Sequence, residues 1–317
     1  MKNLTINQIA QAEFRVTDSS PVIRPFHGSF VAADPSVLTP DLSPDGLWHI
    51  FFHTTFGVWH FSGKDGVTFQ KAGKVASRAM RPDINYTDGR YYLFFERTRP
   101  LIFNALNVVN AAKWKSEIYA VQSPDLKSWS KPYPVITHTR DYEKSERGVS
   151  ISNPFYLRDG EVSRLYYSCG LTYIDDCGFC EPTFISFAES READKNYVAA
   201  KKPIIRPDKN DPHLNLCSGC LKVYRLKDGY IGIQNGIFRQ DGKSRSAVML
   251  LTSADGLNFE FCKMLLEPSE ERAWMRQYVY ASHLVKYGDE LRLYFNARDT
   301  SDMIRGRECI GFAAAKL

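Results

Sequence analysis

Residues 32–53 read AADPSVLTPDLSPDGLWHIFFH, and this stretch decides the fold. Asp34 stands at the start of a short apolar segment, a Pro-Asp-Gly turn follows, and a second segment of aromatic and β-branched residues comes next. Turn residues between two such segments are typical of a β-hairpin. The stretch therefore predicts two antiparallel strands with an acidic side chain at the start of the first.

The same hairpin recurs along the chain. Each copy has a short first strand, a turn that contains Asp-Gly or Gly-Asp, and a second strand rich in aromatic or β-branched residues; the copies cover 81–96, 152–168, 218–234 and 282–296. A third strand follows each hairpin. Several units then end in a short apolar segment that contains proline, here called the closing segment, such as Pro134-Val135-Ile136. Units that recur at this spacing indicate a radial repeat. We predict an all-β fold, a five-bladed β-propeller with four antiparallel strands in each blade.

The predicted propeller is a single domain over residues 1–317. Its blades cover approximately 27–77, 78–138, 149–207, 214–268 and 276–317. The fifth unit ends at Leu317 without a closing segment. A matching segment, Pro21-Val22-Ile23-Arg24-Pro25, lies near the N-terminus. We expect residues 12–25 to supply the outer strand of the fifth blade, because that closure removes an open sheet edge.

Composition excludes several other classes of protein. The formal charge of +5 is spread along the chain, and no Lys/Arg run indicates a nucleic-acid partner. The N-terminal residues lack the apolar block of a signal peptide, and no apolar run is long enough for a membrane span. Walker, Rossmann and nucleophile-elbow motifs are also absent from the sequence. We therefore expect a cytoplasmic protein that does not carry out nucleotide chemistry.

Two insertions interrupt the repeat. Residues 97–115 follow the second strand of the second blade, and residues 171–181 occupy the equivalent place in the third. The first strand of a propeller blade starts, and the second strand ends, on the same face. Both insertions are therefore expected to rise from the face that carries Asp34.

In their order along the chain, the motifs resemble those of five-bladed propeller glycosidases, the broad group around glycoside hydrolase families 43, 32, 62 and 130. The motifs are Ala33-Asp34-Pro35-Ser36, Arg81-Pro82-Asp83-Ile84, Ser123-Pro124-Asp125, Asn153-Pro154-Phe155 and Tyr294-Phe295-Asn296-Ala297-Arg298. The likeness covers nearly the whole chain. It implies a carbohydrate or glycoconjugate ligand at the propeller mouth and requires no cofactor.

The resemblance also implies roles for three carboxylates of family 43: a base in blade 1, an orienting aspartate in blade 3 and an acid in blade 4. Asp34 matches the first, but the other two positions fall at Asn153 and near Ser218. Two hypotheses follow. The protein is a glycosidase that hydrolyses a glycosidic bond, or its scaffold has lost hydrolysis and binds a sugar or serves another reaction, such as glycosyl transfer in glycan or glycoconjugate biosynthesis. A plain interaction propeller ranks last, because it would not need acids gathered at one mouth.

Glycoside cleavage generally needs two carboxyl groups, one of them protonated. We predict Asp34 as the base, Glu96 at the end of the second strand of blade 2 as the acid, and Asp83 as a further catalytic carboxylate at this mouth. The structural alternatives are that Asp34 caps loop amides and that Glu96 pairs with Arg97 or Arg99.

Other polar residues at the blade mouths are candidates for binding the substrate. They are Arg81, His53, Asn153, Arg276, His283 and Arg298. Guanidinium groups suit a carboxylate or phosphate on a ligand. The alternative is that the arginines neutralise the ring of acids and that the histidines are polar packing residues.

Two C-x-x-C pairs, Cys177/Cys180 and Cys217/Cys220, lie in neighbouring blades on the same face. Four thiolates at this spacing suit tetrahedral zinc, so the sequence predicts a zinc site. The alternative is that Cys220 falls inside a strand and packs as a small apolar residue.

Overall fold

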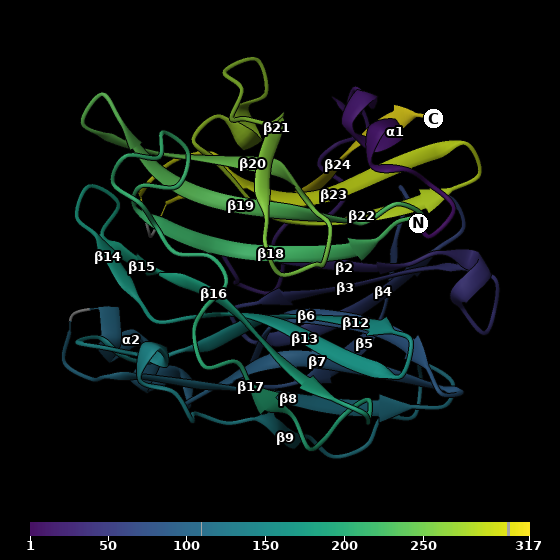
Figure 1. Ribbon diagram of the computed structural model, residues 1–317, viewed down its shortest axis with the longest axis horizontal. Coiled ribbons are helices and arrows are strands. Elements are labelled where there is room, and N and C mark those ends of the chain that lie inside the picture. Colours follow the sequence, from purple (N-terminus) through teal and green to yellow (C-terminus); the bar gives the residue numbers. More distant parts are fainter. Residues whose placement is uncertain (109, 303–304) are drawn as a thin grey trace.

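The computed structural model describes residues 1–108, 110–302 and 305–317 (Figure 1). Five sheets form the blades, each with four antiparallel strands, and two short strands extend the sheet of blade 2; they confirm the predicted propeller. The first strands of neighbouring blades contact one another in a closed circuit, β2 with β6, β6 with β12, β12 with β18, β18 with β22, and β22 with β2. The circuit places five strand starts around one axis.

In blades 1 to 4 the strands follow the sequence order. Blade 1 consists of β2 (Ala33–Leu38), β3 (Trp48–Thr54), β4 (Gly57–Gly63) and β5 (Gln70–Ala76). Blade 2 consists of β6 (Ala79–Thr87), β7 (Arg90–Thr98), β8 (Trp114–Ser123) and β9 (Tyr133–Ile136). Blade 3 consists of β12 (Ile151–Asp159), β13 (Val162–Cys169), β16 (Phe184–Ser190) and β17 (Val198–Ala199). Blade 4 consists of β18 (Cys217–Arg225), β19 (Tyr230–Gln240), β20 (Lys243–Ser253) and β21 (Glu260–Leu266).

Blade 5 joins the two ends of the chain, as the sequence predicts. It consists of β22 (Tyr278–Tyr287), β23 (Glu290–Arg298), β24 (Glu308–Lys316) and β1 (Arg15–Val16). Strand β1 is short, and the Val22 and Ile23 amides also donate to the Ile310 carbonyl. Ahead of β1, helix α1 (Ile6–Gln11) begins with a Thr5/Gln8 capping box. The N-terminal segment therefore covers the edge of the last blade with both paired and packed residues.

Deleting residues 1–23 is expected to abolish the cooperative unfolding transition or to cause aggregation. The deletion exposes the β24 edge and removes the buried side chains of Leu4 and Ile9, each worth roughly 1.5–3 kcal/mol of burial. Thermal melting with light scattering measures the effect. A deletion of residues 1–3, which leaves α1 and β1 in place, is the control. A 1–23 deletion that melts like the full chain would contradict the closure.

The remaining helices and strands are additions to the four strands of each blade. The insertion in blade 2 contains helix α2 (Leu101–Val108), and the insertion in blade 3 forms the hairpin β14 (Thr172–Ile174) and β15 (Phe179–Glu181). A second small hairpin, β10 (Lys144–Ser145) and β11 (Gly148–Val149), pairs with β8. Helix α2 and the β14–β15 hairpin lie at the same end of the molecule, as expected (Figure 1). Three short 3-10 helices cover Pro40–Leu42, Asp141–Glu143 and Ala273–Met275. Among the described helices, none is long and apolar enough to cross a bilayer.

Every first strand is interrupted by a register shift close to its start, between Ala33/Ser36, Met80/Asp83, Ser152/Phe155, Cys217/Cys220 and Val279/Ser282. In the first four blades, one residue within the interruption has a left-handed backbone: Asp34 (φ 54°), Arg81 (φ 53°), Asn153 (φ 48°) and Gly219 (φ 60°). Such a conformation is uncommon outside glycine, and bulges re-aim side chains next to active sites. The repeat therefore presents an aspartate, an arginine and an asparagine at equivalent places around the axis.

Candidate active site

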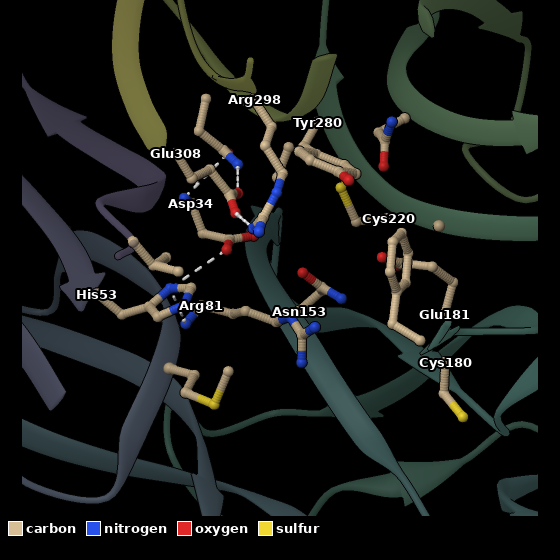
Figure 2. A pocket seen from close by; sticks show the side chains of 17 residues that line it. Asp34, His53, Arg81, Asn153, Cys180, Glu181, Cys220, Tyr280, Arg298 and Glu308 are labelled. Atoms are coloured by element: carbon tan, nitrogen blue, oxygen red, sulfur yellow. Dashed lines mark hydrogen bonds and ion pairs between the residues drawn. The ribbon is translucent and has the colours of Figure 1, made fainter. Parts of the chain in front are cut away.

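A cavity of about 220 Å³ lies where the bulged strands start (Figure 2). Residues of all five blades and of β15 line it. Its polar lining residues are Asp34, His53, Arg81, Asn153, Glu181, Asn235, Tyr280, Asn296, Arg298 and Glu308. The cavity thus combines three carboxyl groups with two guanidinium groups and several neutral donors and acceptors.

Asp34 is held at the cavity by its backbone and by a histidine. Its amide donates to Asn296 Oδ1 at 3.0 Å, and its carboxylate lies 3.2 Å from His53 Nδ1. Burial alone would raise the pKa of Asp34, but His53 and the positive charges of Arg81 and Lys222 bring that pKa below its ordinary value. Asp34 is therefore ionised at neutral pH and can accept a proton.

Glu181 is the last residue of β15, and its position is fixed from the next blade. The Ser218 and Gly219 amides both donate to the Pro182 carbonyl at 3.2 Å, which ties the end of the hairpin to the start of β18. No hydrogen bond or ion pair joins the Glu181 carboxyl to another described residue, and burial raises its pKa to about 7 although Arg81 opposes the shift. Figure 2 shows Asp34 and Glu181 on opposite sides of the cavity.

Glu308, the first residue of β24, lies beside Asp34. Asn296 Nδ2 donates to Glu308 Oε1, and Arg298 Nη1 is 3.6 Å from Glu308 Oε2. Burial raises the pKa of Glu308 to about 8 in spite of the Arg298 charge. Because Asn296 also accepts the Asp34 amide proton, one amide side chain connects the two acidic residues.

Glu96 does not line the cavity. It is fully buried, and its Oε2 accepts a hydrogen bond from Arg81 Nη1. The sequence predicted this residue as the acid, or in a pair with Arg97 or Arg99; the structure instead places it behind Arg81. The bulged backbone of Arg81 turns its guanidinium across the path from Glu96 to the cavity, so Glu96 is suited to orienting Arg81.

Asp83 lies deeper along the axis and is 1% exposed. Its carboxylate accepts the Tyr156 amide at 2.8 Å, Asn85 Nδ2 at 2.7 Å and Ser36 Oγ at 3.5 Å. These bonds connect blades 1, 2 and 3. Burial raises the pKa of Asp83 to about 6, which Lys222 partly opposes. The structure therefore separates Asp83, predicted as catalytic, from the residues that line the cavity.

Asp83→Ala is expected to lower the free energy of unfolding by about 3–5 kcal/mol, since the Tyr156 amide and Lys222 lose a buried acceptor and a counter-charge. Asp83→Asn keeps one acceptor oxygen and should cost less. Urea denaturation measures both variants. An Asp83→Ala variant with wild-type stability and no turnover would instead support the catalytic role predicted from the sequence.

The other predicted binding residues divide into two groups. Arg81, His53, Asn153 and Arg298 line the cavity. His283 lies below it, where its Nδ1 accepts the Val37 amide at 2.8 Å, and the exposed Arg276 donates from Nε to the Asp299 carbonyl at 3.0 Å. The geometry thus places His283 in interblade packing and Arg276 outside the cavity.

The four cysteines do not meet at one point. Cys180 and Cys220 line the cavity, whereas Cys177 Sγ lies 2.9 Å from the Tyr278 hydroxyl and Cys217 is fully buried. In the described part of the chain, no group of three or more His, Cys, Asp or Glu side chains could hold a metal ion. The arrangement therefore does not supply the predicted four-thiolate zinc site, because the first pair lies on a hairpin that turns Cys177 away from Cys180.

Sequence reasoning left two of the cavity's carboxyl groups without a role. Glu181 ends the insertion over residues 171–181, and Glu308 is the first residue of the third strand of blade 5. A signal for Glu308 was present, because the third strand of an antiparallel blade starts on the face where the second one ends. For Glu181 no equivalent signal exists, since the path of an inserted hairpin does not follow from the repeat.

Comparisons with known proteins agree with the fold. No family model matches the sequence, and no curated protein matches it. Solved structures do match, and one described as a glycoside hydrolase has a TM-score of 0.71 at 12% identity, covering 99% of this chain and 96% of that one. The chain shares its fold with glycoside hydrolases.

Two further structures of this fold were solved with carbohydrates. The α-L-arabinofuranosidase of Podospora anserina, in complex with cellotriose, has a TM-score of 0.65 at 14% identity and covers 97% of this chain and 98% of that one. An N-acetylgalactosamine deacetylase of F. plautii, in complex with blood group B trisaccharide, has a TM-score of 0.69 at 13% identity, with 96% of each chain covered. These matches confirm the five-bladed glycosidase-type propeller that the motifs predicted, and identities this low establish the fold alone.

Proposed function

We propose that this protein is a carbohydrate-active enzyme that hydrolyses a glycosidic bond in the cavity between Asp34 and Glu181. One observation carries the proposal: two carboxyl groups face the cavity from opposite sides, and their surroundings displace their pKa values in opposite directions. Titratable groups separated in this way are the mark of an acid and base pair. Hydrolysis with two carboxyl groups is also the usual chemistry of glycosidases.

In the proposed reaction, protonated Glu181 gives its proton to the glycosidic oxygen as the bond to the anomeric carbon breaks. Ionised Asp34 accepts a proton from the water that attacks that carbon, so one water is consumed and both carboxyl groups return to their starting states when their protons exchange with solvent. His53 orients the Asp34 carboxylate through the 3.2 Å contact. Neutral Glu308, together with Asn153 and Tyr280, can form hydrogen bonds with sugar hydroxyls.

Solved structures of this fold support a carbohydrate ligand, because proteins of the same architecture are described in complexes with cellotriose and with a blood group trisaccharide. The alternative is a protein that binds a sugar without cleaving it. Asn153 and the position near Ser218 favour that alternative, since these are the places in blades 3 and 4 where the resemblance implies carboxylates. The cytoplasmic location remains a prediction from the sequence.

A substrate panel tests the proposal. Purified protein is incubated with 4-nitrophenyl glycosides and with oligosaccharides, and the release of nitrophenol or reducing sugar is compared with that of an Asp34→Asn variant. We expect at least one substrate that the wild type cleaves and the variant does not. Sugar binding measured by calorimetry, without release of nitrophenol or reducing sugar, would support the binding alternative. Release of acetate from N-acetylated sugars would show that the reaction is deacetylation and not hydrolysis of a glycosidic bond.

The pH dependence of kcat/KM is expected to be bell-shaped. Asp34 must be ionised, so activity falls as the pH drops through its lowered pKa, below the ordinary value of about 3.9. Glu181 must be protonated, so activity falls as the pH rises through about 7. The optimum therefore lies in mildly acidic solution, and Glu181→Gln should remove the alkaline limb. Activity that increases between pH 7 and 9 would exclude Glu181 as the acid.

A further inference from the structure

A second cavity, of about 150 Å³, adjoins the first. The two share Arg81, Phe179 and Cys180 as lining residues, so a ligand in the first can extend into the second. The volume of each cavity is below the roughly 300–1,000 Å³ of a pocket for a drug-sized molecule. Two small adjoining cavities therefore fit a row of single sugar rings. Arg81 and Cys180, which line both cavities, are labelled in the view of the first (Figure 2).

The second cavity differs from the first in charge. Among the described residues that line it, none is acidic and two are arginines, Arg81 and Arg147. Arg81 is already paired with Glu96. The Arg147 side chain has no hydrogen bond or ion pair with a described residue; it lies over the Tyr173 ring, with its Cζ 4.3 Å from the ring centroid. The positive charge of Arg147 is therefore available to a ligand.

The backbone that carries Arg147 is fixed. Arg147 lies in the turn between β10 and β11, and its carbonyl accepts the Trp114 amide at 2.8 Å. The next residue, Gly148, has a φ of 129°, and a Cβ there would lie 2.1 Å from the Trp114 carbonyl oxygen, so only glycine allows this approach. Close pairing of β11 with β8 thus holds the arginine and the Trp114 ring at one cavity.

We propose that the second cavity binds a sugar carboxylate, that of a uronic acid residue adjoining the bond that is cleaved. The planar guanidinium of Arg147 matches a carboxylate in bidentate geometry, and Trp114 and Tyr173 supply flat apolar surface for the ring. That this residue belongs to the substrate rests on the proposed hydrolytic function. Binding of the acidic sugar itself does not.

Ligand-observed NMR with D-galacturonate and D-galactose tests the site, because the two probes share a ring and differ in the group at C6. Wild-type protein is expected to bind galacturonate ~10-fold or more tightly than galactose, the gain from a charged hydrogen-bonded pair. Arg147→Gln should remove this difference, and Arg147→Lys should retain only part of it, since an ammonium group keeps the charge without the planar fork.

Arg225→Gln is the matched control. Arg225 also lies over a tyrosine, with its Cζ 4.4 Å from the Tyr230 ring centroid, but it lines a different cavity, which His283 also lines. The Arg225→Gln variant should bind both probes as the wild type does. Equal binding of the two probes by the wild type, loss of galacturonate in Arg225→Gln and not in Arg147→Gln, or tighter binding of galactose 6-sulfate than of galacturonate would each overturn the proposal. These readouts need no turnover, so they are independent of whether the substrate panel succeeds.

Discussion

Asp34→Asn is expected to lower kcat by ~10²–10⁴-fold, the usual contribution of a general base. The substitution preserves the shape of the side chain and its hydrogen bonds but removes the proton acceptor at the cavity. The backbone contacts that hold the bulge, including the Asp34 amide to Asn296 at 3.0 Å, remain in place. The melting temperature should therefore change by only a few degrees, and steady-state kinetics with a substrate from the panel measures the loss.

Asp45→Asn provides the control for this variant. Asp45 also pairs with a histidine, since its Oδ1 is 2.8 Å from His49 Nε2, and it too has a lowered pKa, but it lies in the turn between β2 and β3 and does not line the cavity. Its replacement should leave turnover unchanged. Normal turnover by Asp34→Asn would contradict the mechanism, and failure of that variant to fold would show that Asp34 caps the loop.

Glu181→Gln is expected to have an effect that depends on the leaving group. For a sugar or alkyl leaving group, which needs a proton, the rate should fall by ~10²–10⁴-fold. For 2,4-dinitrophenol, which leaves as a stable anion, the rate should be close to that of the wild type in the bond-breaking step. The ratio of the two rates, measured for both proteins, isolates the proton transfer from any effect on binding.

Glu308→Gln distinguishes the two protonated carboxyl groups. Glu308 contacts Asn296 and Arg298 beside Asp34, so its replacement should slow both classes of substrate to a similar degree. If Glu308→Gln shows the leaving-group dependence and Glu181→Gln does not, the acid is Glu308 and the assignment of Glu181 is wrong.

The repeat made most of the fold predictable. Turn chemistry and strand composition specify each hairpin locally, and the order of strands within a blade follows from short connections. The repeat also predicts that Asp34 lies at the mouth, because the first strand of a propeller blade starts on that face. The short β1, with pairing resumed at Ile23, could not be anticipated, since it depends on how the chain crosses the fifth blade.

The site was less predictable because it depends on tertiary contacts. Strand position correctly brings Glu96 toward the mouth, but the left-handed bulge at Arg81 covers it, and a bulge of this kind has no clear sequence signature outside glycine. Asp83 follows that bulge and turns to the axis instead of the cavity. Glu181 reaches the cavity only because its hairpin is tied to the start of blade 4.

In the proposed mechanism, Asp34 and Glu181 flank the bond that is cleaved. A crystal structure of Asp34→Asn with an uncleaved oligosaccharide from the panel tests it most directly. We expect the glycosidic oxygen within roughly 2.6–3.2 Å of a Glu181 carboxyl oxygen, and residue 34 on the other side of the anomeric carbon. A sugar whose glycosidic oxygen lies beside Glu308, or one bound in the cavity lined by Arg225 and His283, would contradict this arrangement.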